Sequence, residues 1–301
     1  MMRFRHFVAS IVVAFLSTAI LTFSAFGQQK LKVFISVDME GISGVVHGEQ
    51  TSSSGRDYGL ARRWMTGDVN AAIRGALKAG ATEVVVNDSH GSMRNVIASE
   101  LHPAASLITG SPKPLSMMQG IDATFDAVML VGYHARAGSE NGVLDHTYSG
   151  GSVYSIRVNG LELGEAGLNA LIAGTFGVPV VLVTGDKEVC RQVRETVGEN
   201  LVTAVVKEGV GRYAAKTLTP EVAQKVIEEK AREALEKRDQ TRPFRLDPPF
   251  TFELNFLRSS MADAAELIPQ VERVNPRTLR FVSEDYIQGF KLLRALIALA
   301  R

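Results

Sequence analysis

The stretch from residue 32 to residue 44 constrains the fold of this chain more than any other. An apolar, β-branched run ends abruptly in Asp38 and Glu40, which are followed by Gly41. This pattern predicts a buried strand that carries two acidic groups at its carboxyl end. Because alternate side chains of a strand lie on the same face, both carboxylates point the same way. Buried like charges this close need a cation, a shared proton or solvent, so a metal site is one interpretation and an acidic turn is the other.

The order of the elements predicts an α/β fold. A helical pattern over residues 57–78 lies between apolar strands at 32–37 and 82–87, which makes a β-α-β unit with parallel strands. Further apolar strands are predicted at 105–108, 127–133 and 179–184. We therefore expect a mostly parallel sheet with flanking helices.

Two domains are expected in a chain of 301 residues, of which 46% are hydrophobic and 22% are charged. A charged amphipathic helix at 220–240 precedes a proline-marked break at 242–249, and the remaining segment alternates between short strands and helices. We place a metal-binding α/β domain at 28–210 and a smaller C-terminal α+β domain at 211–301.

Residues 1–27 have the pattern of a secretory signal peptide. Two arginines lead an apolar run from residue 7 to residue 23, and small residues follow before Gln28. The expected location is therefore exported, either periplasmic or secreted, with no stable membrane association after cleavage. An uncleaved membrane anchor is the competing interpretation, because the run is nearly long enough to span a bilayer.

The charge of the mature chain excludes one class of partner. Removing residues 1–27 takes two arginines from 33 basic side chains, which leaves 31 against 32 acidic ones and a formal charge of −1. This balance gives no support to nucleic-acid binding. The sole cysteine, Cys190, excludes an intrachain disulfide and is expected to be a small packing residue.

Residues of the types that bind metals follow three of the predicted strands. Asp38 and Glu40 follow the first strand, Asp88 and His90 the second, and His134 the strand at 127–133. The carboxyl ends of parallel strands meet at one edge of a sheet, where open α/β folds bind ligands. We therefore expect these side chains to converge, which favours the metal interpretation over the acidic turn. His47 and His102 lack this setting and are expected to be structural.

A two-metal centre is the hypothesis that follows. Glu165, in the first turn of a predicted helix, adds a fifth ligand to Asp38, Glu40, His90 and His134. Mixed imidazole and carboxylate ligation suits zinc, with manganese or cobalt as alternatives. Five ligands exceed the tetrahedral set of one zinc but suit two ions if one carboxylate bridges them. Residues 142–158 are glycine-rich and alternating, which predicts a hairpin that carries His146.

Five ordered motifs resemble those of the M55 metallopeptidases. They are Ser36-Val37-Asp38-Met39-Glu40-Gly41, Asn87-Asp88-Ser89-His90, Gly132-Tyr133-His134-Ala135-Arg136, His146 with its neighbours, and Gly164-Glu165-Ala166-Gly167-Leu168-Asn169-Ala170. The resemblance implies that Asp38, Glu40, His90, His134 and Glu165 bind two zinc ions, with Asp38 as the bridge, and that His146 is catalytic. It also implies two α/β domains and a homo-oligomer, because the type member of the family is a ring-stacked decamer. The signal peptide departs from that type member.

The expected function is an exported zinc-dependent aminopeptidase. It would hydrolyse the N-terminal peptide bond of short peptides, those with D-amino acids of the D-Ala type, by water activated between two metals, while His146 moves a proton toward the leaving amine. Two alternatives stay open. One is a two-metal phosphoesterase, for which Arg136 could contact a phosphate, and the other is a non-catalytic exported protein that binds a metal or ligand.

Overall fold

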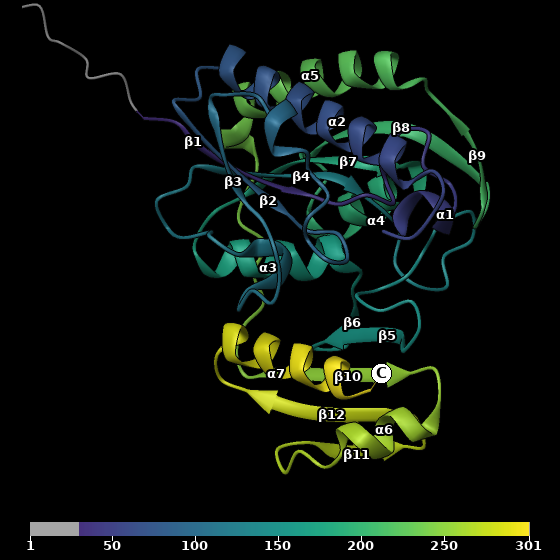
Figure 1. Cartoon of the computed structure of the whole chain (residues 1–301). Coiled ribbons are helices and arrows are strands. Elements are labelled where there is room, and N and C mark those ends of the chain that lie inside the picture. The colour runs from purple at the N-terminus through teal and green to yellow at the C-terminus, as the bar shows by residue number, and fades with distance from the viewer. Residues whose placement is uncertain (1–29, 301) are drawn as a thin grey trace, which may run out of the picture.

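The computed structural model describes residues 30–300, which form two sheets with flanking helices (Figure 1). The predicted signal peptide at 1–27 lies outside the described residues. Within residues 30–300, no helix is both long and apolar enough to cross a membrane.

The larger sheet has seven strands in the order β3-β2-β1-β4-β7-β8-β9. Every neighbouring pair is parallel except β8 and β9, which form an antiparallel hairpin. The strands are β1 (Lys32–Val37), β2 (Glu83–Asp88), β3 (Ala105–Ile108), β4 (Ala127–Tyr133), β7 (Val180–Asp186), β8 (Val202–Gly211) and β9 (Ala214–Thr217).

Helices cover both faces of this sheet because its strands are apolar on both sides. Val33 and Ile35 pack with α2 (Tyr58–Lys78) and α5 (Pro220–Glu236), which lie together above the sheet in Figure 1. Phe34 points to the opposite face, as strand alternation requires, and joins the core formed with α3 (Glu165–Thr175) and α4 (Lys187–Val197). A four-residue helix, α1 (Gly48–Thr51), and short 3-10 turns at Ala98–Glu100, Ser116–Met118 and Arg238–Gln240 complete this part.

The second sheet is antiparallel and has five strands in the order β11-β12-β10-β5-β6. They are β5 (Val153–Val158), β6 (Leu161–Glu162), β10 (Phe250–Phe256), β11 (Glu272–Asn275) and β12 (Thr278–Ser283). Helices α6 (Ser259–Ala265) and α7 (Tyr286–Leu299) pack against this sheet. Figure 1 shows α3 between the two sheets, and one continuous apolar core joins them.

The predicted fold class is confirmed, and some local predictions are wrong. Residues 142–158 do not form a hairpin, because only Val153–Val158 is a strand and its partners are β6 and β10. Strands β8, β9 and β11 and helix α4 were not predicted. The domain boundary at residue 210 stays a prediction, although the sheets themselves exchange segments across it: β9 completes the large sheet, and β5–β6 belong to the small one.

The strand order creates a switch point between β1 and β4. The chain runs outward from β1 through β2 to β3 and then returns to place β4 on the other side of β1. In open α/β sheets the crevice at the carboxyl ends of such a pair is the usual ligand site. Here the residues that directly follow these two strands are Asp38 and His134.

Candidate metal centre

The turn after β1 holds its two carboxylates close to β4. The Asp38 backbone N–H donates to Val131 O at 2.8 Å, which extends the sheet pairing by one residue. The Gly41 N–H donates to Gly132 O at 2.7 Å, and a Cβ at Gly41 would lie 1.9 Å from a backbone oxygen of β4. Only glycine allows this close approach. As a result Asp38 and Glu40 are both buried, with 2% and 6% of their surface exposed.

His90 meets these carboxylates from the turn after β2. Its Nδ1 lies 2.9 Å from Glu40 Oε2 and 3.4 Å from Asp38 Oδ1. Asp88, which the sequence grouped with the metal-type residues, instead accepts hydrogen bonds from the backbone N–H groups of Asn95 and Val96. It therefore shapes the turn that presents His90.

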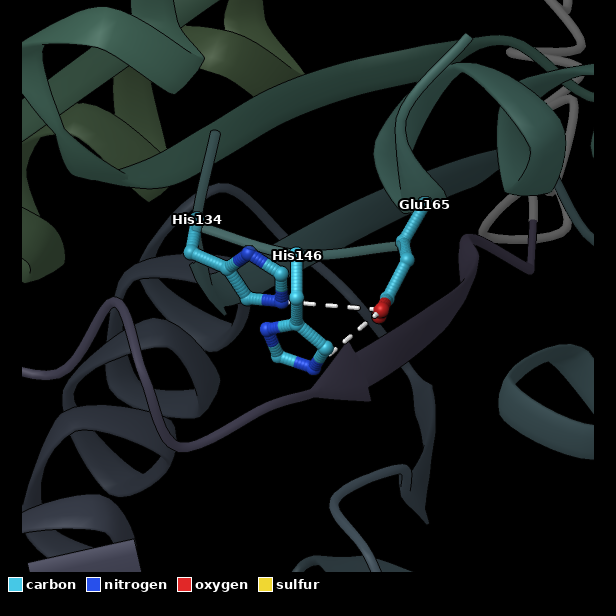
Figure 2. A group of neighbouring side chains, drawn as sticks. All are labelled: His134, His146 and Glu165. Carbon is cyan, nitrogen blue, oxygen red and sulfur yellow. Dashed lines mark ion pairs between the residues drawn. The ribbon is translucent and has the colours of Figure 1, made fainter. Parts of the chain in front are cut away.

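A second group of three side chains lies beside the first. Figure 2 shows His134 and His146 with their rings face to face and both directed at Glu165, which begins α3. The ring centroids are 4.1 Å apart with an interplanar angle of 7°. Each Nε2 atom lies 3.6 Å from Glu165 Oε1. Glu165 Oε1 also accepts the backbone N–H of Tyr148 at 2.6 Å, which fixes the carboxylate.

The three histidines share one arrangement, in which a backbone carbonyl holds the ring nitrogen that faces away from the centre. These contacts are His90 Nε2 to Thr51 O at 2.8 Å, His134 Nδ1 to Ala135 O at 2.9 Å and His146 Nδ1 to Leu144 O at 2.9 Å. Because a carbonyl only accepts, each of these nitrogens carries the proton. In the neutral imidazole the other nitrogen therefore directs a lone pair inward, as metal-binding histidines do.

The ligand atoms form two sets that fit two cations. Asp38, Glu40 and His90 offer one set, and His134, His146 and Glu165 offer the other, with the atoms of each set within 4.8 Å of one another. Donors about 2.0–2.1 Å from a tetrahedral zinc lie about 3.3 Å apart. The 3.4 and 3.6 Å separations above are close to that value.

Asp38 connects the two sets. Its Oδ1 lies 3.4 Å from His90 Nδ1, and its Oδ2 lies 3.4 Å from His134 Nε2. Among residues 30–300, Asp38 Oδ2 and His134 Nε2 are buried and find no hydrogen-bond partner. Buried polar atoms are nearly always satisfied, so two unsatisfied atoms that face each other fit a cation between them. This placement supports Asp38 as the bridging carboxylate.

The acid–base balance of the cluster also favours a cation. Burial, together with the adjacent Glu40, raises the pKa of Asp38 to about 7. Burial alone would lower the pKa of His134, but the Glu165 carboxylate raises it to about 10. Burial and the neighbouring His134 lower the pKa of His146 below its usual value. When no metal ion neutralises the carboxylates, they therefore hold a proton on His134.

The structure brings all six predicted site residues together, in one detail differently from the sequence interpretation. His146 was expected only to transfer protons, from a hairpin above the metals. Its Nε2 lies among the ligand atoms of the second set, so its geometry suits metal binding as well as proton transfer. His47 and His102 make local contacts, in line with the structural role expected of them: His47 caps α1, and His102 Nδ1 accepts the N–H of Ala104.

Sequence reasoning missed Lys207, which lies on β8 and is 2% exposed. Its ammonium group donates to the carbonyl oxygens of Glu40, Ile42 and Val45, and thus fastens the turn that follows the first ligands. Burial lowers its pKa to about 8. Its partners are backbone atoms from a distant segment, so no spacing in the sequence could indicate this role.

Comparisons with known proteins decide the family. The profile of the M55 peptidase family, described as D-aminopeptidase, matches residues 31–295. The chain belongs to the M55 family. The D-aminopeptidase of Bacillus subtilis (strain 168) is 38% identical over 273 residues, which are 90% of this chain and 98% of the relative. The solved structure described as "Zn-dependent D-aminopeptidase DppA from Bacillus subtilis, a self-compartmentalizing protease" has a TM-score of 0.87 at 36% identity, and the match covers 90% of this chain and 98% of that one.

The M55 resemblance drawn from the motifs is therefore confirmed, together with the fold. The relatives are named as D-aminopeptidases, which confirms a hydrolase and disfavours the non-catalytic binding protein. The choice of zinc agrees with the description of the solved M55 structure. The role of each individual site residue stays a prediction, which the geometry of the two sets supports.

Proposed function

We propose that this chain is a zinc-dependent D-aminopeptidase that removes the N-terminal residue of short peptides at a two-metal centre. The observation that carries the proposal is the meeting of six buried or half-buried side chains, the five predicted ligands and His146, in two adjacent sets joined by Asp38. Zinc ions bound there would polarise the scissile carbonyl and make water more acidic.

The chain's own residues would divide the remaining work. Glu40 and His90 hold one side of the centre, and Glu165 and His134 hold the other, each fixed by the contacts described above. His146 has its Nδ1–H bound to Leu144 O, so its Nε2 is the atom free to exchange a proton. His146 takes a proton from the attacking water at Nε2 and delivers it to the leaving amine.

His146→Ala tests this division of work. The variant should keep its metal content while turnover of a D-aminoacyl dipeptide falls by roughly 10²–10⁴-fold, the usual range for a general acid–base group. The defect should shrink on a D-aminoacyl nitroanilide, because that leaving group needs little protonation. Steady-state kinetics with both substrates and elemental analysis of the same preparation measure these quantities. His102→Ala is the matched control, since that histidine only caps a turn.

Two results would contradict the proton-transfer role. Loss of one metal equivalent in His146→Ala would make His146 a ligand. Equal slowing of the dipeptide and the nitroanilide would make it a structural residue. In either case the two-metal centre would stand, but another group would have to supply the proton.

We infer the preference for D-amino acids from the relatives, which are named D-aminopeptidases, and a panel of substrates tests it. Purified mature protein should hydrolyse D-alanyl amides and dipeptides faster than their L counterparts. It should leave phosphate esters intact. Arg136 is the cation that a phosphoesterase would use to contact a phosphate, and it forms an ion pair with Glu162 at 3.4 Å instead. Faster hydrolysis of phosphate esters than of any peptide would replace the proposal with the phosphoesterase.

The proposal includes the assembly and location of the enzyme. The solved relative is described as self-compartmentalizing, which supports a homo-oligomer for this chain, and the family resemblance favours a decamer. The signal-peptide pattern at residues 1–27 supports export to the periplasm or beyond.

A further inference from the structure

The loop between β4 and β5 holds His146 in a backbone shape that the loop does not favour by itself. Three residues without the freedom of glycine have positive φ angles: Asn141 at 58°, Leu144 at 54° and Tyr148 at 59°. Leu144 is also buried, with 6% exposure. Asparagine tolerates this conformation, but Leu144 and Tyr148 cost about 1–2 kcal/mol each, so contacts from elsewhere must hold them.

The tip of the β8–β9 hairpin provides those contacts. The Leu144 N–H donates to Arg212 O at 2.9 Å, and the Arg212 guanidinium donates to both the backbone carbonyl and Oδ1 of Asp145. Gly209 lies so close to the loop that a Cβ there would be 1.9 Å from Asn141 O. The hairpin therefore contacts the loop at Asn141, Leu144 and Asp145.

Asp145 connects the hairpin to the earlier part of the loop. Its Oδ2 accepts the backbone N–H groups of Gly138 at 2.6 Å and Ser139 at 3.3 Å. His146 follows directly, and its ring is oriented by the carbonyl of Leu144, the residue whose N–H Arg212 holds. The Asp145 side chain is 10% exposed and that of Arg212 is 40% exposed, so their ion pair is partly shielded from water.

We propose that Arg212 is a positioning residue, which acts through Asp145 to hold His146 over the metal centre. This inference rests on the proposed proton-transfer role of His146. It gives the β8–β9 hairpin a part in catalysis, although the hairpin contributes none of the six candidate site residues. A small displacement of a catalytic group is enough to slow turnover, so the hairpin tip should control rate rather than metal binding.

The experiment uses the zinc-loaded mature protein. It compares Arg212→Ala, Arg212→Lys, His146→Ala and the double variant that combines Arg212→Ala with His146→Ala. Arg212→Ala should lower kcat on a D-alanyl dipeptide by about 10- to 100-fold, with little change in KM or metal content. Arg212→Lys should recover part of the loss, because lysine keeps the charge near Asp145. Lys216→Ala removes an exposed cation from the same hairpin and should match the parent enzyme.

Two readouts separate positioning from general damage. Adding Arg212→Ala to His146→Ala should cause no further loss of kcat, because the route through His146 is already broken. Hydrogen exchange of segment 138–147 should accelerate in Arg212→Ala, while exchange of the large sheet stays unchanged. A further kcat loss in the double variant, unchanged exchange of the segment or a lost metal equivalent would each overturn the proposal. If His146→Ala alone keeps full turnover, the proton-transfer role fails, and the exchange result still decides whether Arg212 holds the loop.

Discussion

At the scale of single residues, the two oxygens of Asp38 define the centre. One faces His90 and the other faces His134, each at 3.4 Å from an inward-directed ring nitrogen. No other side chain of the described residues joins both ligand sets in this way. A change at Asp38 should therefore affect both ions, whereas a change at any other ligand should affect mainly one.

Asp38→Asn should be the most damaging substitution of a ligand. The amide keeps the shape but has one oxygen and no negative charge, so the bridge is lost. We expect less than the full metal complement and turnover lowered by at least about 10²–10³-fold, the range for removing one electrostatic stabiliser. Metal analysis and kinetics measure this, with the exposed Asp122→Asn as the control. Full metal content and rate in Asp38→Asn would show that another group bridges the ions.

Sequence reasoning reached Asp38 and His134 because each directly follows an apolar strand, and parallel strands bring their carboxyl ends together. It could not reach Lys207 or Arg212 in the same way. Both bind backbone carbonyls of segments more than 60 residues away along the chain, and such contacts leave no pattern of residue types. The hairpin predicted around His146 failed for the same reason, because distant contacts decide the shape of that loop.

At the scale of elements, β8 supports the turn after β1 through Lys207. Three carbonyl oxygens of this turn accept hydrogen bonds from one ammonium group. Their burial makes the contact important, because an unsatisfied buried acceptor costs about 1–3 kcal/mol. The strand thus contributes to the centre without providing a ligand.

Lys207→Met should destabilise the protein by about 3 kcal/mol, since it fills the space but removes the ammonium donor from all three carbonyls, of which Ile42 O keeps only its bond from the Val45 N–H at 3.2 Å. For a chain of this size that corresponds to a fall in Tm of roughly 6–12 °C. Calorimetry of the metal-free protein measures the fall without a contribution from zinc. Lys225→Met on α5 is the control, because its side chain is 73% exposed and its ion pair contributes little. Equal Tm values for the two variants would refute the role of Lys207.

At the scale of the whole molecule, Asp38, Glu40, His90 and His134 follow strands of the large sheet, and Glu165 begins α3. The small sheet lies on the other side of α3 (Figure 1). Strands β5 and β6 cross into the small sheet directly after the loop of His146, so the two parts are linked close to the centre. Export would place this molecule outside the cytoplasm, where its lack of an intrachain disulfide leaves stability to the continuous core.

We predict export followed by cleavage near Gly27, because the apolar run at 7–23 ends in small residues. Cell fractionation and N-terminal sequencing of the product check this directly. A soluble form that begins near Gln28 is the expected result. An intact chain in the membrane fraction would establish the anchor interpretation instead.

The metal content of the purified mature protein tests the central claim most directly. The five predicted ligands in two sets, Asp38, Glu40, His90, His134 and Glu165, exceed the requirement of one tetrahedral zinc, so the chain should bind about two zinc ions. Elemental analysis after saturation with zinc and removal of excess metal gives the number per chain, and removal by a chelator should abolish peptide hydrolysis until zinc is restored. Two ions per chain is the predicted result, and one ion or fewer under saturating zinc would contradict the two-metal account.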